Sequence, residues 1–180
     1  MPLKDDLLKI ITGDVLDDPQ TLTTYSKDAS IFEIKPKIIV YPKNTQDIKN
    51  LVLYAAKNNI SITARSGGTD MTGAAIGEDI ILDMSKYFNK LIKVSGDSTV
   101  VQPGMFYKDF ETETLKKGLL LPTYPASREI CTIGGMIANN AGGELELTYG
   151  PINKYLKSLK IVLADGNEYF FKALNKKFNK

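Results

Sequence analysis

The 180-residue sequence contains no histidine, and this absence excludes several kinds of catalytic chemistry. Serine–histidine and cysteine–histidine nucleophile pairs, histidine metal ligands and the usual near-neutral general base are all ruled out. The single cysteine, Cys131, excludes an internal disulfide framework and, in the absence of histidine, a zinc site. The carboxylates show no clustering typical of an oxygen-ligand site, so we expect no metal. Any chemistry therefore depends on a cofactor or on a base from elsewhere.

The sequence also has little net charge and no long apolar run. The formal net charge is +2, with lysines scattered among acids, so we expect no nucleic-acid partner. We expect no integral membrane segment and no signal peptide at residues 1–6. One cysteine fits a reducing compartment, so the sequence predicts a cytoplasmic protein. The apolar fraction of 43% and the charged fraction of 24% are typical of a globular domain.

A first glycine-rich stretch covers residues 65–73, with the sequence R-S-G-G-T-D-M-T-G. Residues 60–64 before it alternate apolar and polar side chains, which indicates a strand. Gly67 and Gly68 can turn their amides inward as an anion nest, and the hydroxyls of Thr69 and Thr72 would add donors. A phosphate would repel Asp70, so we expect Asp70 to accept hydrogen bonds from loop amides as an Asx turn, or from a ligand hydroxyl.

Known phosphate-binding motifs do not match this stretch. Ala74 and Ala75 stand where a Walker loop needs Lys and Ser or Thr, and the adjacent glycines do not have the G-x-G-x-x-G spacing. A triphosphate clamp and a standard Rossmann site are therefore not indicated. An ordinary turn rich in Gly and Thr remains the alternative for this stretch taken alone.

A second glycine-rich stretch covers residues 132–143, with the sequence T-I-G-G-M-I-A-N-N-A-G-G. Its apolar residues have helical spacing, and Gly134 and Gly135 at the start would expose backbone amides without obstruction by side chains. Small residues at both ends indicate close approach to another group. Two such stretches, far apart in the chain, favour one binding site with two walls.

Periodicity predicts the elements around these stretches. Residues 37–65 form a β-α-β unit, with Thr45 as N-cap of its helix. A helix is predicted over 107–117, and we expect Phe106, Phe110 and Leu115 to contact the core. The remaining expected elements are a helix over 3–11, strands over 79–84, 90–94, 99–102, 156–163 and 168–171, and a helix beginning at 132.

Four blocks of the sequence, residues 25–30, 65–73, 125–143 and 161–166, occur in the order seen in FAD-linked oxidases. The chain resembles the PCMH-type FAD-binding domain over about residues 20–172, and within that superfamily the glycolate oxidase subunit and D-lactate dehydrogenase group. The resemblance implies an α+β fold of two α+β subdomains, about 36–102 and 103–172, with FAD between them. Residues 1–19 would be a helical lead-in, and 173–180 a basic tail or the start of a linker to a cap domain.

The resemblance also implies which residues contact FAD. The first stretch would hold the pyrophosphate, the second would line the flavin ring and ribityl chain, and a third pair would lie on the adenine side. Arg65 is alternatively a strand-end residue paired with a carboxylate. We expect FAD to be non-covalent, with Cys131 a small buried hydrophobe. The resemblance assigns the pyrophosphate to Arg65, Ser66, Gly67, Gly68, Thr69 and Asp70. It assigns the ring and ribityl chain to Pro125, Ser127, Thr132, Gly135, Asn139 and Gly142, and the adenine side to Ile161 and Val162.

The function implied is that of the FAD-binding portion of a flavin-dependent oxidoreductase. It would oxidise a 2-hydroxy acid of the D-lactate, glycolate or 2-hydroxyglutarate class by hydride transfer to flavin N5, with amides around Gly134 and Gly135 stabilising charge on the reduced ring. The catalytic residues are not identified, because the base and the substrate-binding arginines belong to a cap domain that this sequence lacks. The partners would be a small-molecule substrate, an electron acceptor, and a cap domain or partner subunit. The alternatives are a stand-alone FAD-binding or electron-transfer module, an inactive fragment and, with a poorer fit, a cell-wall reductase.

Overall fold

The computed structural model describes residues 2–173, and the first half of the chain is built on a four-stranded sheet. The strand order is β1-β2-β4-β3, in which β2 and β3 pair parallel with β4 and β1 pairs antiparallel with β2. Because β2, β3 and β4 are parallel, their carboxyl ends lie at one edge of the sheet. The strands are β1 (Asp14–Leu16), β2 (Ile38–Tyr41), β3 (Ile62–Arg65) and β4 (Ile80–Asp83).

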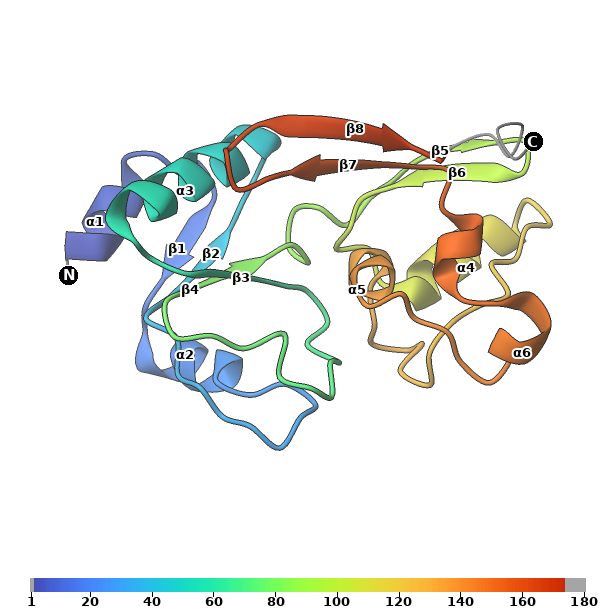
Figure 1. Cartoon of the computed structure of the whole chain (residues 1–180), viewed down its shortest axis with the longest axis horizontal. Coiled ribbons are helices and arrows are strands. Elements are labelled where there is room, and N and C mark those ends of the chain that lie inside the picture. Colours follow the sequence, from blue (N-terminus) through green and yellow to red (C-terminus); the bar gives the residue numbers. More distant parts are fainter. Residues whose placement is uncertain (1, 174–180) are drawn as a thin grey trace, which may run out of the picture.

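Three helices accompany this sheet (Figure 1): α1 (Pro2–Leu8), α2 (Pro19–Tyr25) and α3 (Thr45–Asn58). The α3 helix connects β2 to β3, which confirms the predicted β-α-β unit. Its N-cap is Asn44, whose side chain accepts from the Asp47 amide at 3.0 Å, so the prediction of Thr45 is wrong by one residue. Asn59 ends the helix in the left-handed region at φ 54°.

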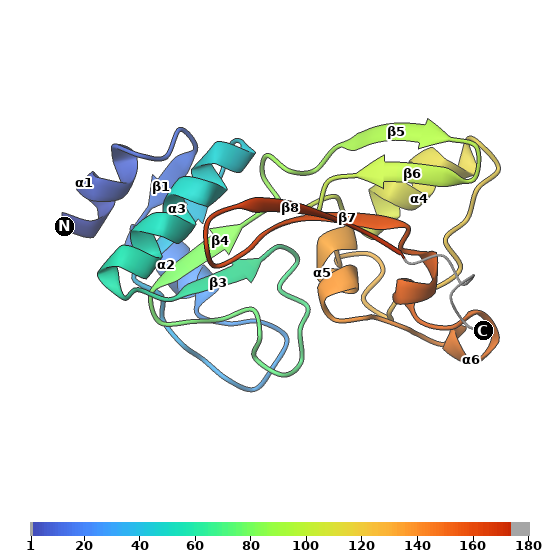
Figure 2. The same ribbon diagram turned by 45° about the horizontal axis from the view of Figure 1, so that its top comes forward.

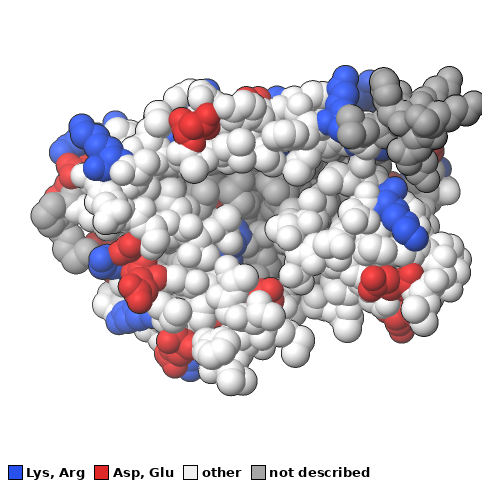
Figure 3. Space-filling model, in the orientation of Figure 1, with Lys and Arg blue, Asp and Glu red and all other residues white. Residues whose placement is uncertain are grey.

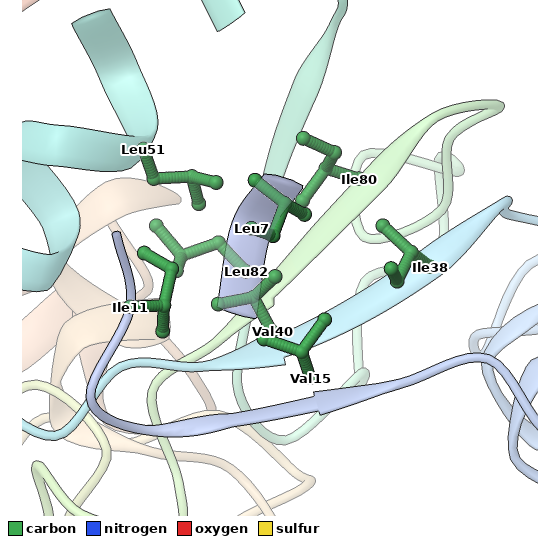
Figure 4. Packing of buried hydrophobic residues seen from close by; sticks show 8 residues of the cluster. All are labelled: Leu7, Ile11, Val15, Ile38, Val40, Leu51, Ile80 and Leu82. Carbon is green, nitrogen blue, oxygen red and sulfur yellow. The ribbon is translucent and has the colours of Figure 1, made fainter. Parts of the chain in front are cut away.

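The core of the first half lies between the sheet and its helices (Figure 4). The β-branched run of β2 is fully buried, with Ile38, Ile39 and Val40 at 0% exposure, as expected for a strand covered on both faces. Strand β1 was not predicted, because its three residues are too few for a periodic signal. Its Val15 nevertheless pairs with Val40 and is buried. The cluster consists of Leu7, Ile11, Val15, Ile38, Val40, Leu51, Ile80 and Leu82.

The second half contains two hairpins and a group of short helices. The β5–β6 hairpin turns at Gly96, which has φ 58°, and confirms the predicted turn between two strands. The elements are β5 (Leu91–Ser95), β6 (Ser98–Val101), α4 (Tyr107–Leu115), α5 (Ile133–Ala138), α6 (Glu146–Tyr149), the 3-10 helix η1 (Ile152–Tyr155), β7 (Ser158–Val162) and β8 (Glu168–Lys172).

A separate core in this half forms around α4 and α5. The inward face of α4 carries Tyr107, Phe110 and Thr114, which lie at three- and four-residue steps. Leu115 is one position past Thr114 and is 53% exposed, so its predicted place in the core is wrong. The Tyr107 ring is fully buried, and its hydroxyl donates to the Leu121 carbonyl at 2.8 Å. The cluster consists of Met105, Tyr107, Phe110, Cys131, Ile133, Met136, Ala141 and Ile152.

The β7–β8 hairpin leaves the second half and runs back to the first (Figures 1 and 2). At its tip Gly166 has φ 75°, and a Cβ there would lie 2.7 Å from Cγ of Leu53 on α3. The exact boundary between the halves remains a prediction. Leu91 and Val101 of the β5–β6 hairpin pack on the second core, which favours a boundary before that hairpin.

Within residues 2–173 the structure contains no helix with the length and apolar character needed to cross a membrane. The predicted basic tail lies outside the described residues from 174 onward.

Asp47 is the buried charge that joins the start of α3 to the first turn of the chain. Its side chain is 1% exposed and accepts hydrogen bonds from the amides of Thr12 at 3.0 Å, Gly13 at 3.1 Å and Lys43 at 2.8 Å. Asp47→Asn turns an amide NH2 toward these donors, so we expect a loss of about 3 kcal/mol in the free energy of unfolding in urea. Asp109→Asn, at an exposed acid in the first turn of α4, is the matched control. A loss below about 1 kcal/mol for Asp47→Asn would contradict this account.

Candidate functional site

The first glycine loop leaves β3 at the carboxyl edge of the sheet, and Asp70 holds its shape. One Asp70 oxygen, Oδ1, accepts from the Thr72 amide at 2.7 Å, the Thr72 hydroxyl at 2.7 Å and the Ala74 amide at 3.0 Å. These hydrogen bonds, chiefly the one from the Thr72 side chain, lower the pKa of Asp70. The predicted Asx turn is therefore confirmed. The Thr72 hydroxyl donates within the loop, so the expectation that it faces a ligand is not supported.

The adjacent glycines Gly67 and Gly68 are needed in this loop for different structural reasons. Gly68 has φ 63°, as expected for a residue that turns the backbone inward. Gly67 is required by space, because a Cβ there would lie 2.4 Å from the carbonyl oxygen of Ile130. Ile130 directly precedes the second glycine-rich stretch. The second half of the chain therefore passes against the first loop at Gly67.

A hydroxyl pair joins the two glycine-rich stretches directly. Ser66 Oγ and Thr132 Oγ1 lie 2.6 Å apart, and Thr132 is 1% exposed. Thr132 is also the N-cap of α5, and its Oγ1 accepts from the Gly135 amide at 3.3 Å. Its own hydroxyl hydrogen can therefore donate to Ser66. The structure thus brings Ser66 and Gly67 together with Thr132 and Gly135, although the two pairs lie far apart in the sequence.

The start of α5 does not present its amides to a ligand. The Ile133 amide donates to the Met105 carbonyl at 2.9 Å, and the Gly134 amide donates to the Pro103 carbonyl at 2.8 Å. A Cβ on Gly134 would lie 2.5 Å from Cβ of Pro103. Gly134 thus allows helix α5 to pack against the turn at residues 103–105. The expectation that amides around Gly134 and Gly135 stabilise a reduced ring is wrong in this structure, because protein oxygens already accept from them.

Arg65, at the end of β3, ties the first loop to the segment after α2. Its Nη1 donates to the carbonyls of Lys27 at 2.8 Å, Ala75 at 3.3 Å and Tyr25 at 3.4 Å. Its guanidinium also lies over the Tyr25 ring, with Cζ 4.9 Å from the centroid. Its partners are carbonyls and an aromatic ring, so the alternative of a carboxylate pair is not observed in the described residues. Contact of Arg65 with a phosphate remains a prediction.

Beside this loop, Tyr25, Tyr41 and Asp83 form a hydrogen-bonded group that the sequence analysis did not predict. The Tyr25 hydroxyl donates to Asp83 Oδ2 at 2.7 Å and lies 2.7 Å from the Tyr41 hydroxyl. Burial is the main reason that the pKa of Tyr25 is raised, and hydrogen bonds to Tyr41 and Asp83 add to the shift. Asp83 and Tyr41 are the last residues of neighbouring parallel strands, so the parallel pairing itself was the signal that their side chains meet. The segment that follows Tyr25 also contacts the first loop, because the Ala29 amide donates to the Gly68 carbonyl at 3.1 Å.

The other predicted residues of the second stretch line a turn and the end of α5. The carbonyl of Ser127 accepts from the Cys131 amide at 2.8 Å, and the amide of Asn139 donates to the Gly135 carbonyl at 3.0 Å. Gly142 is half-buried, and a Cβ on the adjacent Gly143 would lie 1.9 Å from the Tyr124 carbonyl oxygen. The chain on either side of α5, which includes Pro125, therefore closes on itself.

Thr69, Cys131, Ile161 and Val162 complete the predicted set. Thr69 is half-buried in the first loop. Cys131 is 3% exposed and burial raises the pKa of its thiol, which confirms a small buried hydrophobe. Ile161 and Val162 lie half-buried on β7, and their adenine role remains a prediction.

The molecular surface is hollowed between the two halves, below the β7–β8 hairpin (Figure 3). Two other depressions lie at the base of that hairpin and beside α1 and α3, and neither contains a predicted site residue.

The Ser66–Thr132 pair can be tested by a double-mutant cycle. We expect Ser66→Ala and Thr132→Val each to lower the free energy of unfolding by about 1 kcal/mol, because each removes a half-buried or buried hydroxyl partner. The double variant should lose less than the sum, with a coupling energy of at least about 0.5 kcal/mol in urea unfolding. Thr112→Val, at an exposed helical threonine, is the control for the change of side chain. Losses that add to within about 0.3 kcal/mol would contradict contact between the two loops.

Comparison with known proteins places this geometry in a family. The model of the family described as "FAD binding domain" matches residues 36–170. The glycolate oxidase subunit GlcD of Bacillus subtilis is 29% identical over 170 residues, covering 92% of this chain and 36% of that protein. The D-lactate dehydrogenase of Archaeoglobus fulgidus is 33% identical, covering 72% of this chain and 29% of that protein. The D-2-hydroxyglutarate dehydrogenase of Escherichia coli is 31% identical, covering 87% of this chain and 16% of that protein.

Solved structures agree with the fold. The structure of an alkyldihydroxyacetonephosphate synthase superposes with a TM-score of 0.82 at 25% identity, covering 97% of this chain and 38% of that one. The 6-hydroxy-D-nicotine oxidase of Arthrobacter nicotinovorans superposes with a TM-score of 0.79 at 24% identity, covering 90% of this chain and 36% of that one. This chain thus spans between 16% and 38% of the length of these proteins. It has the predicted α+β fold of the PCMH type, and it belongs to the FAD-binding domain family of FAD-linked oxidoreductases.

Proposed function

We propose that this chain is the FAD-binding portion of an oxidoreductase that oxidises a 2-hydroxy acid. The observation that carries the proposal is the meeting of two glycine-rich loops at Ser66 and Thr132. The surface is also hollowed between the two halves of the chain (Figure 3). Family membership supports FAD as the cofactor. The relatives named for glycolate, D-lactate and D-2-hydroxyglutarate support the substrate class.

The residues around the contact fit a dinucleotide. The glycines let protein groups pack closely on the loop backbone, with the Ile130 carbonyl against Gly67 and the Arg65 guanidinium against Gly68. Positive charge is fixed at the first loop, because Arg65 is held by three carbonyls. The negative charge of Asp70 is balanced by hydrogen bonds inside the loop, which reduces its repulsion of a phosphate.

The proposed contacts follow the sequence assignment. Residues 65–70 would hold the pyrophosphate. Pro125, Ser127, Thr132, Gly135, Asn139 and Gly142 would line the ring and ribityl chain, and Ile161 and Val162 the adenine side. When bound, FAD accepts a hydride from the carbon that bears the substrate hydroxyl. The part of this chain is to fix the relative position of both loops through Ser66 and Thr132, and to hold Arg65 in one orientation.

Attachment of FAD is proposed to be non-covalent. The sequence has no histidine, and the Cys131 thiol is 3% exposed with a pKa raised by burial, so little reactive thiolate forms. The base that takes the hydroxyl proton and the groups that bind the substrate carboxylate are proposed to come from a cap domain or a partner subunit. An electron acceptor completes the cycle. The single buried cysteine also supports a reducing compartment such as the cytoplasm.

FAD binding can be measured by fluorescence titration of the purified protein, and Gly67→Ala is the decisive variant. Its Cβ would overlap the Ile130 carbonyl, so the loops must separate, and we expect FAD affinity to fall by at least about tenfold, a cost of about 1.4 kcal/mol. Gly96→Ala is the control: its Cβ would meet no atom within 4 Å, and its φ of 58° would strain the β5–β6 turn without touching the loop contact. Equal FAD affinity in the two variants would contradict a site at the loop contact.

The substrate class is tested with the flavin-loaded protein combined with the proposed cap domain or partner subunit. Bleaching of the flavin absorbance by D-lactate, glycolate or D-2-hydroxyglutarate under anaerobic conditions is the expected result. A preparation reduced by dithionite but by none of these acids would favour an electron-transfer module. The relatives' names favour the hydroxy-acid enzyme over that alternative.

A further inference from the structure

The β7–β8 hairpin forms a two-stranded sheet that is exposed along one complete strand. All five residues of β8 are exposed, and within residues 2–173 β7 is the only strand paired with it. The aromatic side chains of β8 have exposures of 39% for Tyr169, 56% for Phe170 and 49% for Phe171. Isolated two-stranded hairpins are marginally stable, and apolar edge strands pair readily with other strands. The outer edge of β8 is therefore a candidate interaction surface.

The hairpin is held in a fixed conformation, as a docking strand must be. Asp165 in the turn accepts from the Asn167 amide at 2.9 Å and from the Tyr169 hydroxyl at 2.6 Å. These hydrogen bonds, chiefly that from Tyr169, lower the pKa of Asp165 to about 2. The register with β7 is unbroken from Ser158–Lys172 to Val162–Glu168. At the tip, Gly166 is buried and lies close to Leu53 of α3.

The sequence of β8, E-Y-F-F-K, is complementary to itself when reversed. We propose that β8 pairs antiparallel with β8 of a second copy of this chain, about a two-fold axis at Phe170. In this register Glu168 of each copy lies opposite Lys172 of the other, and Tyr169 lies opposite Phe171. Both charge pairs are attractive and the central Phe170 side chains pack on each other. A symmetric dimer needs such a self-complementary surface.

Other strand arrangements lack this complementarity. Parallel in-register pairing of β8 places Glu168 against Glu168 and Lys172 against Lys172, which is repulsive. A shift by one residue moves the aromatic side chains to opposite faces. Self-pairing along β7, with the sequence S-L-K-I-V, places Lys160 against Lys160 at the axis. The charges therefore select β8 and the antiparallel direction.

The aromatic faces explain what such a dimer would bury. Tyr169 and Phe171 already lie on one face, with ring centroids 6.3 Å apart, so pairing would extend them into a cluster of four rings. Phe170 lies on the other face, with Lys172 Nζ 5.4 Å from its centroid. Two five-residue strands give a small interface, so we expect a dimer with a dissociation constant in the micromolar range or weaker.

The experiment compares the association of charge-reversed variants by sedimentation velocity over a wide range of protein concentration. Two-fold symmetry means that Lys172→Glu turns two attractive pairs into repulsive ones, so the dissociation constant should rise about tenfold or more. Glu168→Lys should do the same. An equimolar mixture of the two variants should form a heterodimer, because one copy then carries lysine and the other glutamate at both positions. Lys116→Glu, at an exposed lysine of the α4 C-cap, is the control and should leave association unchanged.

Glu168 also pairs with Lys160 inside the hairpin at 3.0 Å, so Glu168→Lys could loosen the hairpin itself. A second variant, Phe170→Cys, avoids this difficulty. Oxidation with diamide should give a covalent dimer, since the two thiols face each other at the axis, whereas Ile92→Cys on exposed β5 should give little. Cys131 is buried and does not interfere. A wild-type protein that stays monomeric at all concentrations, or a dimer that Lys172→Glu leaves unchanged, would overturn the proposal.

Discussion

The contact of the two glycine loops is the constraint on which the rest of the structure depends. Ser66 reaches Thr132 at 2.6 Å, and Gly67 lets the Ile130 carbonyl approach to a distance that no side chain would allow. These contacts join the half built on the four-stranded sheet to the half built on α4 and α5. Each half has its own core, and at the far end of the β7–β8 hairpin Gly166 also lies against Leu53 of the first half. The glycines at the contact therefore serve the packing of the two halves.

The parallel pairing of β2, β3 and β4 explains why the polar side chains around the first loop gather at one edge of the sheet. The strands β2, β3 and β4 end at one edge with Tyr41, Arg65 and Asp83. Tyr25 fills the space between these side chains, and the chain that follows it donates to the first loop through Ala29. Charge is balanced locally throughout this region, because Arg65 faces carbonyls and Asp70 faces amides. The conformation of the loop is thus fixed by the protein itself, which would lower the cost of binding a ligand.

The sequence predicted the long periodic elements and the loop chemistry that depends on a few residues. Helix α3, the β5–β6 hairpin and the Asx turn at Asp70 all followed from local signals. Strand β1 was too short for such a signal, and α2 was missed although Asp18 caps it and Pro19 starts it. The role of the Gly134 amide could not be predicted, because its acceptor, the Pro103 carbonyl, lies far away in the chain. Local chemistry was readable, whereas the partners brought by tertiary packing were not.

The central claim is that both glycine loops hold one FAD molecule, and hydrogen exchange with mass spectrometry tests it most directly. The account predicts that FAD slows amide exchange in residues 66–75 and in residues 132–143 together, and leaves the β5–β6 hairpin unchanged. Slower exchange in only one of the two loops would contradict it.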